Sequence, residues 1–379
     1  MPNEVYITRL AKFLPNQPVA NDDMEKYLGT GDGKPSKGKR IILRINKIKT
    51  RYYALDENGR LTHTNAQLTA EAIRALLDDL FTVDDIELLA CGTTSPDQLI
   101  PSHAAMVHGA LGGKPMDIIS PSGACASGMH AMKYAYLAAL SGDKRNAVCS
   151  GSELFSTWLR ARNFEKETEK LYLLDQQPIL TFEKDFLRWM LSDGAGAALL
   201  QDKPNEKGLS LRIDWIENVS FANQLKTCAY AGGEKLENGN LKGWREFEAH
   251  ELVERSVFSV RQDVRLLDEY IVRQSHQFLR DIVRRRKFDL DKISFFLPHI
   301  SSEYFRSRVD ANSRDQGVYI PQKKWFTNLT RLGNAGAASI YFMLEELFHS
   351  DRLKKGQQIL LGIPESARFS YVYALLTAV

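Results

Sequence analysis

The chain contains at residues 116–140 the stretch MDIISPSGACASGMHAMKYAYLAAL, which predicts a strand, a turn of small residues and a helix. A second stretch, FTNLTRLGNAGAASIYFMLEELF (326–348), again predicts a turn rich in Gly and Ala followed by a helix. An apolar strand is predicted after each of them, in NAVCSGSE (146–153) and in QQILLGIPE (357–365). Because the same order of elements occurs twice, the sequence indicates a tandem duplication.

The repetition continues on the N-terminal side of each stretch. In the first half, helical periodicity in TAEAIRALLDDLF (69–81) precedes an apolar strand and a polar loop in DDIELLACGTTSP (84–96). In the second half, a helix in VRQSHQFLRDIVRRRKF (272–288) precedes a strand and a loop in DKISFFLPHISSE (291–303). We therefore predict an α/β fold built from two similar halves.

The halves divide after LSDGAGAALL (191–200), which predicts a last strand for an N-terminal half of residues 1–205 and leaves residues 206–379 as the C-terminal half. Two segments stand outside the repeat, the polar segment 29–40 and the insertion 155–190. The insertion is rich in aromatic residues: Phe155, Trp158, Phe164, Tyr172, Phe182, Phe186 and Trp189. Long loops of this kind more often shape a binding site than a core.

Composition excludes several classes of protein. Lys and Arg total 50 against 47 Asp and Glu, so the surface as a whole does not favour nucleic acid. The four cysteines show neither CxxC nor CxxH spacing, which argues against a disulfide framework and against a metal site. The N-terminus has no signal pattern and no apolar run is long enough for a membrane span, so we expect a cytoplasmic protein.

Cys125 lies in SGACASG (122–128), between the predicted strand and helix, where small neighbours let the backbone turn tightly. Its thiol is therefore expected at a helix N-terminus, where the helix dipole and unpaired N–H groups stabilise a thiolate and lower the pKa of Cys125. The same N–H groups can bind a developing oxyanion. The alternative interpretation is a small, inert, buried residue.

Two polar residues of the second half are expected near this thiol. His299 and Asn334 follow predicted strands or turns at the corresponding positions of the repeat, at the edge where α/β sheets bind ligands. Taken singly, His299 could be a structural histidine and Asn334, in LGNAG, a turn residue. Their joint placement with Cys125 favours a catalytic group of three.

With these residues in place, the chain resembles the thiolase superfamily, and within it the ketoacyl synthase III branch of condensing enzymes. The segments that carry the resemblance are FLPNQPVANDDMEKYL (13–28), IKTRYYA (48–54), TSPDQLIPSHAAMVHGALG (94–112), LSDGAGAALL (191–200), LPHISS (297–302) and RLGNAGAAS (331–339). The resemblance implies a five-layered αβαβα fold and a homodimer. It also implies that Cys125 takes the acyl chain as a thioester, while His299 and Asn334 hydrogen-bond the carbonyl of a second thioester and stabilise its enolate.

The chain departs from the branch at two places. Members that accept coenzyme A carry a tryptophan where this chain has Ile41, so the expected substrates are thioesters on the phosphopantetheine arm of an acyl carrier protein, with no other cofactor. The usual glycine-rich turn near the C-terminus is replaced by GIPESARFSYVYALL (362–376), in which Ser366, Ala367 or Arg368 must supply the oxyanion N–H. Arg368 could bind a β-keto oxygen or a carboxylate, or form a structural ion pair instead.

The segment RINKIKTRYYALDENGRLTHTNAQLTAEAI (44–73) resembles the subgroup that makes dialkylresorcinol or cyclohexanedione rings. The resemblance implies condensation of a β-ketoacyl thioester with a second β-ketoacyl or α,β-unsaturated acyl thioester. Carbon between two carbonyls is already acidic, so this chemistry needs a base rather than the decarboxylation of malonyl. Glu153 is the candidate base, because an apolar pocket raises the pKa of a carboxyl group. The alternative is a buried structural pair between Glu153 and an arginine.

Arginines are the candidates for binding the acidic carrier protein. Arg306 and Arg308 lie just beyond His299 and are predicted to dock it, whereas RRRK (284–287) is interpreted as a solvated helix end. GDGKPS (31–36) is not a phosphate loop, because Pro stands where Ser or Thr is needed.

Other functions remain open on the same scaffold. The chain could be an initiating ketoacyl synthase III that uses malonyl carrier protein, an ester-forming acyltransferase, or a catalytically silent partner subunit. A thiolase proper is disfavoured because no cysteine follows Cys228 to act as a second catalytic thiol.

Overall fold

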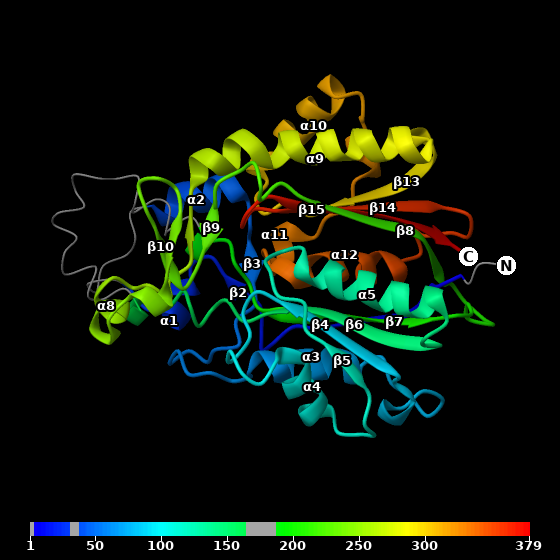
Figure 1. Cartoon of the computed structure of the whole chain (residues 1–379), viewed down its shortest axis with the longest axis horizontal. Coiled ribbons are helices and arrows are strands. Elements are labelled where there is room, and N and C mark those ends of the chain that lie inside the picture. The colour runs from blue at the N-terminus through cyan, green and yellow to red at the C-terminus, as the bar shows by residue number, and fades with distance from the viewer. Residues whose placement is uncertain (1–3, 31–37, 164–186) are drawn as a thin grey trace.

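The structure, a computed structural model, describes residues 4–30, 38–163 and 187–379. It has five layers, in which two sheets enclose a central pair of helices and further helices cover the outer face of each sheet (Figure 1). The central helices are α5 (Ser127–Ser141) and α12 (Ser339–Phe348). The predicted five-layered α/β fold is confirmed.

The two halves contain sheets of the same design. The first has the order β5-β4-β6-β7-β1 and the second the order β13-β14-β15-β8, and a short antiparallel pairing of β1 with β8 joins them into one nine-stranded sheet. Their strands are β1 (Tyr6–Phe13), β4 (Leu88–Thr93), β5 (Asp117–Ile119), β6 (Asn146–Glu153), β7 (Gly194–Gln201), β8 (Leu211–Ser220), β13 (Ile293–Pro298), β14 (Gln358–Glu365) and β15 (Ser370–Ala378). β4 pairs with β6 in parallel as β13 does with β14, and the next two pairings are antiparallel in both sheets. This shared pairing supports the duplication.

Hydrophobic clusters fill the spaces between the layers. One lies around α5 and α12, a second between the second sheet and the outer helices α9 (Val264–Arg286) and α10 (Tyr304–Asp315), and a third between the first sheet and α3 (Asn65–Arg74) and α4 (His103–Leu111). The shorter elements are α1 (Met24–Leu28), α2 (Lys39–Asn46), α8 (Ala249–Glu254), α11 (Leu329–Leu332), β2 (Val19–Ala20), β3 (Thr50–Arg51), β9 (Ala229–Tyr230), β10 (Gly233–Lys235), β11 (Leu241–Gly243) and β12 (Arg261–Gln262).

Small residues let the central layer pack closely. A Cβ atom at Gly151 in β6 would lie 2.2 Å from the carbonyl oxygen of Ala337, and one at Gly128 in α5 would lie 2.5 Å from the same oxygen. The turn before α12 therefore rests directly on the backbone of the first half. This contact brings the Asn334 turn next to the Cys125 turn.

Several predicted boundaries shift in the structure. The helix predicted over 69–81 starts at Asn65 and ends at Arg74, because the Asp78 carboxylate accepts the N–H groups of Leu80 and Phe81 and forms a turn. The helix predicted from 272 begins eight residues earlier at Val264, where the Asp263 side chain caps it. The division predicted at 205 lies between β7 and β8.

Parts of the two predicted extra segments lie outside the described residues. They include the whole GDGKPS stretch, and Phe164, Tyr172, Phe182 and Phe186 of the aromatic insertion. Among the residues that the structure describes, no helix is both long and apolar enough to cross a membrane.

Candidate active site

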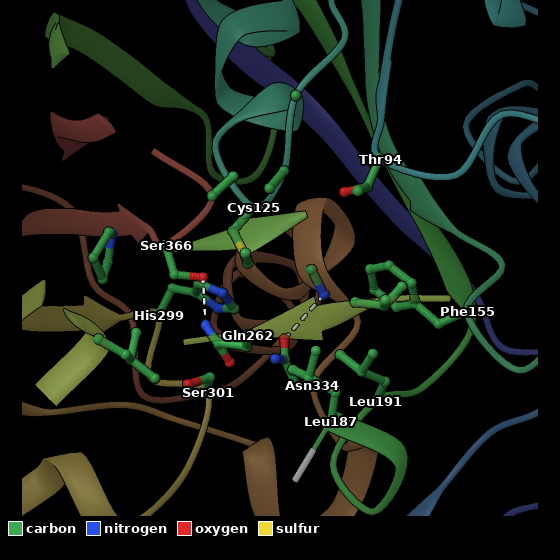
Figure 2. A pocket seen from close by; sticks show the side chains of 18 of the residues that line it. Thr94, Cys125, Phe155, Leu187, Leu191, Gln262, His299, Ser301, Asn334 and Ser366 are labelled. Carbon is green, nitrogen blue, oxygen red and sulfur yellow. Dashed lines mark hydrogen bonds between the residues drawn. The ribbon is translucent and has the colours of Figure 1, made fainter. Parts of the chain in front are cut away.

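A cavity of about 600 Å³ lies where the two halves meet, and Cys125, His299 and Asn334 all line it. The three side chains come from separate elements, namely the turn before α5, the residue after β13 and the turn after α11 (Figure 2). The structure therefore brings together the three residues that the sequence singles out.

Cys125 lies two residues before the first residue of α5 and is partly buried. Burial raises the pKa of its thiol, and the nearby carboxylates of Glu365 and Glu153 raise it further. The predicted lowering of the pKa of Cys125 is therefore wrong in this state. The cost of moving a thiolate out of water, next to two carboxylates, outweighs the favourable helix terminus.

His299 is held by its own backbone, whose N–H donates to the carbonyl of Gly362 at 2.8 Å. Burial lowers the pKa of the His299 imidazole to about 4, so the ring is neutral at physiological pH. Its Nε2 is buried and makes no hydrogen bond within the described residues. With its hydrogen on Nε2, the neutral ring can donate a hydrogen bond to a substrate oxygen.

Asn334 is fixed on three sides. Its backbone N–H donates to Met190 at 3.0 Å, its carbonyl accepts from Ser192 at 2.9 Å, and its side-chain Oδ1 accepts from the N–H of Gly336 at 3.0 Å. Because Oδ1 is engaged, the amide orientation is set. Among the described residues no hydrogen bond engages Nδ2, which leaves this N–H₂ group as a donor for a ligand.

Glu153 lies at the end of β6 and is fully buried. It accepts hydrogen bonds from the hydroxyls of Thr94 at 2.6 Å and Ser95 at 2.7 Å and from the N–H of Ala337 at 3.1 Å. Burial raises the pKa of Glu153 to about 7, in the predicted direction. No arginine pairs with it within the described residues, so the structural alternative of a Glu–Arg pair is wrong.

Glu153 also does not line the cavity, whereas Thr94 in front of it does. Neutral donors from three residues already occupy its carboxylate. The structure therefore does not support Glu153 as a base in contact with substrate. Its hydrogen bonds to Thr94 and Ala337 instead connect the first half to the Asn334 turn.

The altered C-terminal turn places its side chains in opposite directions. Ser366 and Ala367 line the cavity, and the Ser366 hydroxyl accepts from Gln262 Nε2 at 2.9 Å (Figure 2). Arg368 is exposed and does not line the cavity, so the prediction that it contacts substrate is wrong. The reason is the backbone at Phe369, whose φ of 57° turns the phenyl ring into the core and leaves Arg368 outside.

The predicted docking arginines are already engaged by acidic neighbours. Arg306 forms an ion pair with Glu303, and Arg308 lies 3.0 Å from the carboxylate of Asp268. Both arginines sit on α10, whose Phe305 and Val309 line the cavity. In RRRK, Arg285 and Arg286 form ion pairs with Glu217, so this stretch is a paired helix end rather than a freely solvated one.

Glu365 is the neighbour of the nucleophile that sequence reasoning missed. Its Oε2 accepts the backbone N–H of Ala124 at 3.1 Å and that of Ala126 at 3.2 Å, so it flanks Cys125 on both sides. The available signal was an acidic residue inside the turn where the branch has glycines.

The cavity wall around these groups is largely apolar. Residues of the described part of the insertion contribute to it, among them Phe155, Trp158 and Leu187, and so does Leu191 just after the insertion. Phe155, Leu187 and Leu191 are labelled in Figure 2. Trp189 is fully buried but does not line it. The apolar wall fits an acyl chain. The Cys125 thiol, His299 Nε2 and Asn334 Nδ2 fit the reactive carbonyl at the end of that chain.

Known proteins resemble the chain in both halves. Residues 84–205 match the family described as beta-ketoacyl synthase, N-terminal domain, and residues 283–362 match 3-oxoacyl-[acyl-carrier-protein] synthase III C terminal. A beta-ketoacyl-[acyl-carrier-protein] synthase III from Clostridium perfringens is 26% identical, with 92% of each chain covered. Its counterpart from Chlorobaculum tepidum is 24% identical, with 94% of each chain covered.

Solved structures agree on the fold. AbyA1, described as a tetronic acid condensing enzyme, superposes with a TM-score of 0.76 at 19% identity, over 98% of this chain and 99% of that one. A variant of OleA from Xanthomonas campestris with bound lauric acid and lauroyl-CoA superposes with a TM-score of 0.73 at 19% identity over the full length of both. With the family matches, the shared fold and the cavity described above, the chain belongs to the thiolase superfamily and is a condensing enzyme, an acyltransferase similar to ketoacyl-acyl-carrier-protein synthase III.

Proposed function

We propose that this enzyme is a carrier-protein-dependent ketosynthase in which Cys125 carries the first acyl group and His299 and Asn334 bind the carbonyl of the second thioester. The observation that carries the proposal is that all three side chains line one cavity, while His299 Nε2 and Asn334 Nδ2 have no hydrogen-bond partner among the described residues. Relatives of the chain named acyl-carrier-protein synthases support carrier-bound substrates.

In the first step the Cys125 sulfur attacks the carbonyl carbon of an acyl thioester. The new C–S bond forms as the bond to the pantetheine sulfur breaks, and the thiol proton of Cys125 leaves with that sulfur. Because the pKa of the Cys125 thiol is raised, the proton has to be removed as the attack occurs rather than beforehand. The departing thiol and the acyl-enzyme are the products.

In the second step we assign a β-ketoacyl thioester as the partner, which makes the enzyme a ring-forming synthase of the dialkylresorcinol or cyclohexanedione type. The α-carbon loses a proton, and the enolate oxygen accepts hydrogen bonds from Asn334 and His299. The α-carbon then attacks the acyl carbonyl on Cys125, so a C–C bond forms and the C–S bond breaks. The Cys125 thiolate takes up one proton and the enzyme returns to its starting state.

The base in this step is not assigned to Glu153, which is buried behind Thr94. It is not assigned to His299 either, because Nε2 of this ring donates to the enolate oxygen and a pKa of about 4 makes the ring a weak base. The α-proton lies between two carbonyls and is already acidic, so it passes to solvent. The Cys125 thiolate regains a proton from solvent as the product leaves.

Carrier-bound rather than coenzyme A substrates are supported by Ile41, which is 49% exposed on α2 and offers no aromatic ring for adenine. Arg306 and Arg308 remain candidates for contact with the carrier protein, although each must then exchange its present acidic partner. We also expect a homodimer and no cofactor beyond the phosphopantetheine arm. Light scattering of the purified protein measures the first of these.

The test is product analysis after the enzyme is mixed with two β-ketoacyl carrier thioesters and no malonyl carrier. A cyclic dione product supports the ring-forming assignment. Turnover that requires malonyl carrier identifies an initiating ketoacyl synthase III instead. No turnover with either, together with no acylation of Cys125, identifies a silent partner subunit and contradicts the proposal.

A further inference from the structure

The cavity has an arm that extends away from Cys125 between the outer helices and the second sheet. Apolar side chains from α9, α10 and β13 form most of its wall: Leu267, Ile271, Val272, Phe296, Phe305 and Val309. α9 begins at the catalytic end, where the neighbouring Gln262 hydrogen-bonds to Ser366. Because a helix rises 1.5 Å per residue, His276 lies about 13 Å beyond Leu267 along the axis of α9.

A polar cluster interrupts the apolar wall at that depth. It consists of Ser275, His276 and Tyr373, which all line the cavity and are 7%, 4% and 2% exposed. The Ser275 and Tyr373 hydroxyls are 2.8 Å apart and share a hydrogen bond. His276 Nδ1 lies 2.8 Å from Oδ1 of Asn312 on α10.

The contact with Asn312 fixes which nitrogen of His276 carries the hydrogen. An amide oxygen only accepts, so Nδ1 must donate to it. Burial lowers the pKa of the His276 imidazole, which keeps the ring neutral. Nε2 is then a hydrogen-bond acceptor, and none of the described residues forms a hydrogen bond with it.

The wall at this place is rigid as well as polar. A Cβ atom at Gly362 would lie 2.9 Å from the Tyr373 ring and 3.0 Å from the Phe296 ring, so both rings are packed against the glycine. The Tyr373 hydroxyl is therefore held in one position beside Ser275. Desolvated hydrogen-bonding groups in an apolar channel are costly unless a ligand or water engages them.

From this arrangement we infer that the polar cluster of Ser275, His276 and Tyr373 is a specificity subsite for a hydroxyl group at the far end of the acyl chain carried by Cys125. The hydroxyl of the chain, aliphatic or phenolic, donates to Nε2 of His276, and the Ser275–Tyr373 pair lies beside it. A chain that ends in a methyl group leaves Nε2 of His276 without a partner among the described residues. The inference rests on the proposed acylation of Cys125 and adds a class of substrate to it.

The test is a competition between lauroyl and ω-hydroxylauroyl carrier thioesters for Cys125, followed by intact-protein mass spectrometry. We expect the hydroxylated chain to be loaded roughly fivefold to tenfold faster. In His276→Leu this ratio should fall towards one, whereas His276→Gln, which retains an acceptor, should keep part of it. His250→Leu, an exposed histidine on α8, serves as the matched control and should keep the full ratio. The same competition is then run with an acyl chain that ends in a phenol. Its loading rate shows whether the subsite prefers an aliphatic or a phenolic hydroxyl.

The subsite would be overturned if the unaltered enzyme loaded both chains equally fast. It would also be overturned if His276→Leu left the ratio of the two loading rates unchanged. In either case the polar cluster would bind water and not the acyl chain. A second measurement separates this from failure of the acylation itself. Calorimetry of Cys125→Ala with ω-hydroxylauric and lauric acid reports binding without chemistry. Tighter binding of the hydroxy acid with no acylation of the unaltered enzyme would keep the subsite and reject the proposed function, and equal binding would reject the subsite.

Discussion

The backbone N–H of Ala126 donates to Oε2 of Glu365 over 3.2 Å, and the same oxygen accepts the N–H of Ala124 at 3.1 Å. One carboxylate thus ties the turn on both sides of Cys125 to the end of β14. It also takes up two N–H groups at the start of α5 that would otherwise face an anion. Glu365 therefore positions the nucleophile and at the same time disfavours its thiolate.

Replacing Glu365 by Gln should make Cys125 more acidic. The amide oxygen can still accept both N–H bonds, so the turn is retained, while the negative charge that raises the pKa of the thiol is removed. The rate of alkylation of Cys125 by iodoacetamide, followed against pH, should reach its half-maximum at lower pH in Glu365→Gln. Glu346→Gln, a surface carboxylate paired with Arg331, is the control. An unchanged or raised midpoint would show that Glu365 does not act on the thiol.

Asn334→Asp should separate acyl loading from condensation. The substituted side chain keeps an oxygen for the N–H of Gly336 but loses the Nδ2 donor and adds a negative charge where an enolate would form. Loss of one such donor costs about a hundredfold to a thousandfold in rate. Single-turnover measurements should show condensation falling by this factor, and falling more than loading does. Equal losses of rate in loading and in condensation would show that Asn334 holds the shape of the site and does not stabilise the enolate.

Glu153 should make folding more favourable as the pH falls from 7 towards 4.5. Its pKa is about 7 in the folded protein and 4.5 in the reference state, so within this range the folded chain binds more protons than the unfolded chain. The free energy of unfolding therefore gains on the order of 3 kcal/mol from this group between pH 7 and pH 4.5, and loses it again as the pH rises.

Urea unfolding of the unaltered protein and of Glu153→Gln at several pH values measures this contribution. His103 and His299, with pKa values of about 4, act in the opposite direction in both proteins, because their unfolded forms bind protons first as the pH falls. They cancel in the comparison. The free energy of unfolding of the unaltered protein should rise relative to that of Glu153→Gln as the pH is lowered, and a difference that does not change with pH would contradict the assigned pKa.

Close packing of the central layer should make Gly151 intolerant of any side chain. An alanine there would place Cβ 2.2 Å from the Ala337 carbonyl oxygen, which cannot move without displacing the Asn334 turn. We expect Gly151→Ala to lower the free energy of unfolding by about 3 kcal/mol. Gly109→Ala is the matched control, since α4 leaves its Cβ position open, and it should raise stability by up to about 1 kcal/mol. Similar effects of the two substitutions would contradict the packing argument.

The sequence alone is sufficient to predict the duplicated α/β fold and the grouping of Cys125, His299 and Asn334. The reason is that these residues stand at the ends of repeated elements, and equivalent strand ends of a duplicated fold meet in space. The span of β6, 146–153, also follows from local pattern alone. Local sequence, in other words, determines which elements exist and where their polar ends lie.

What the sequence does not reveal depends on contacts between distant segments and on side-chain direction. Glu365 meets Ala124 across 241 positions, and its charge adds to the burial that raises the pKa of Cys125. Arg368 is adjacent in sequence to Ala367, which lines the cavity, yet the backbone turn at Phe369 leaves Arg368 outside. Glu153 has the predicted raised pKa but is enclosed by Thr94 and Ser95, which only the folded structure places around it.

The most direct test of the account is a time course of intact-protein mass spectra after one equivalent of a β-ketoacyl carrier thioester is added, followed by a second thioester. The account predicts an adduct with the mass of the acyl group that maps to Cys125, not to the buried Cys91, Cys149 or Cys228, and that disappears only when the second thioester arrives. An adduct on another cysteine, or turnover that persists in Cys125→Ala, would contradict it.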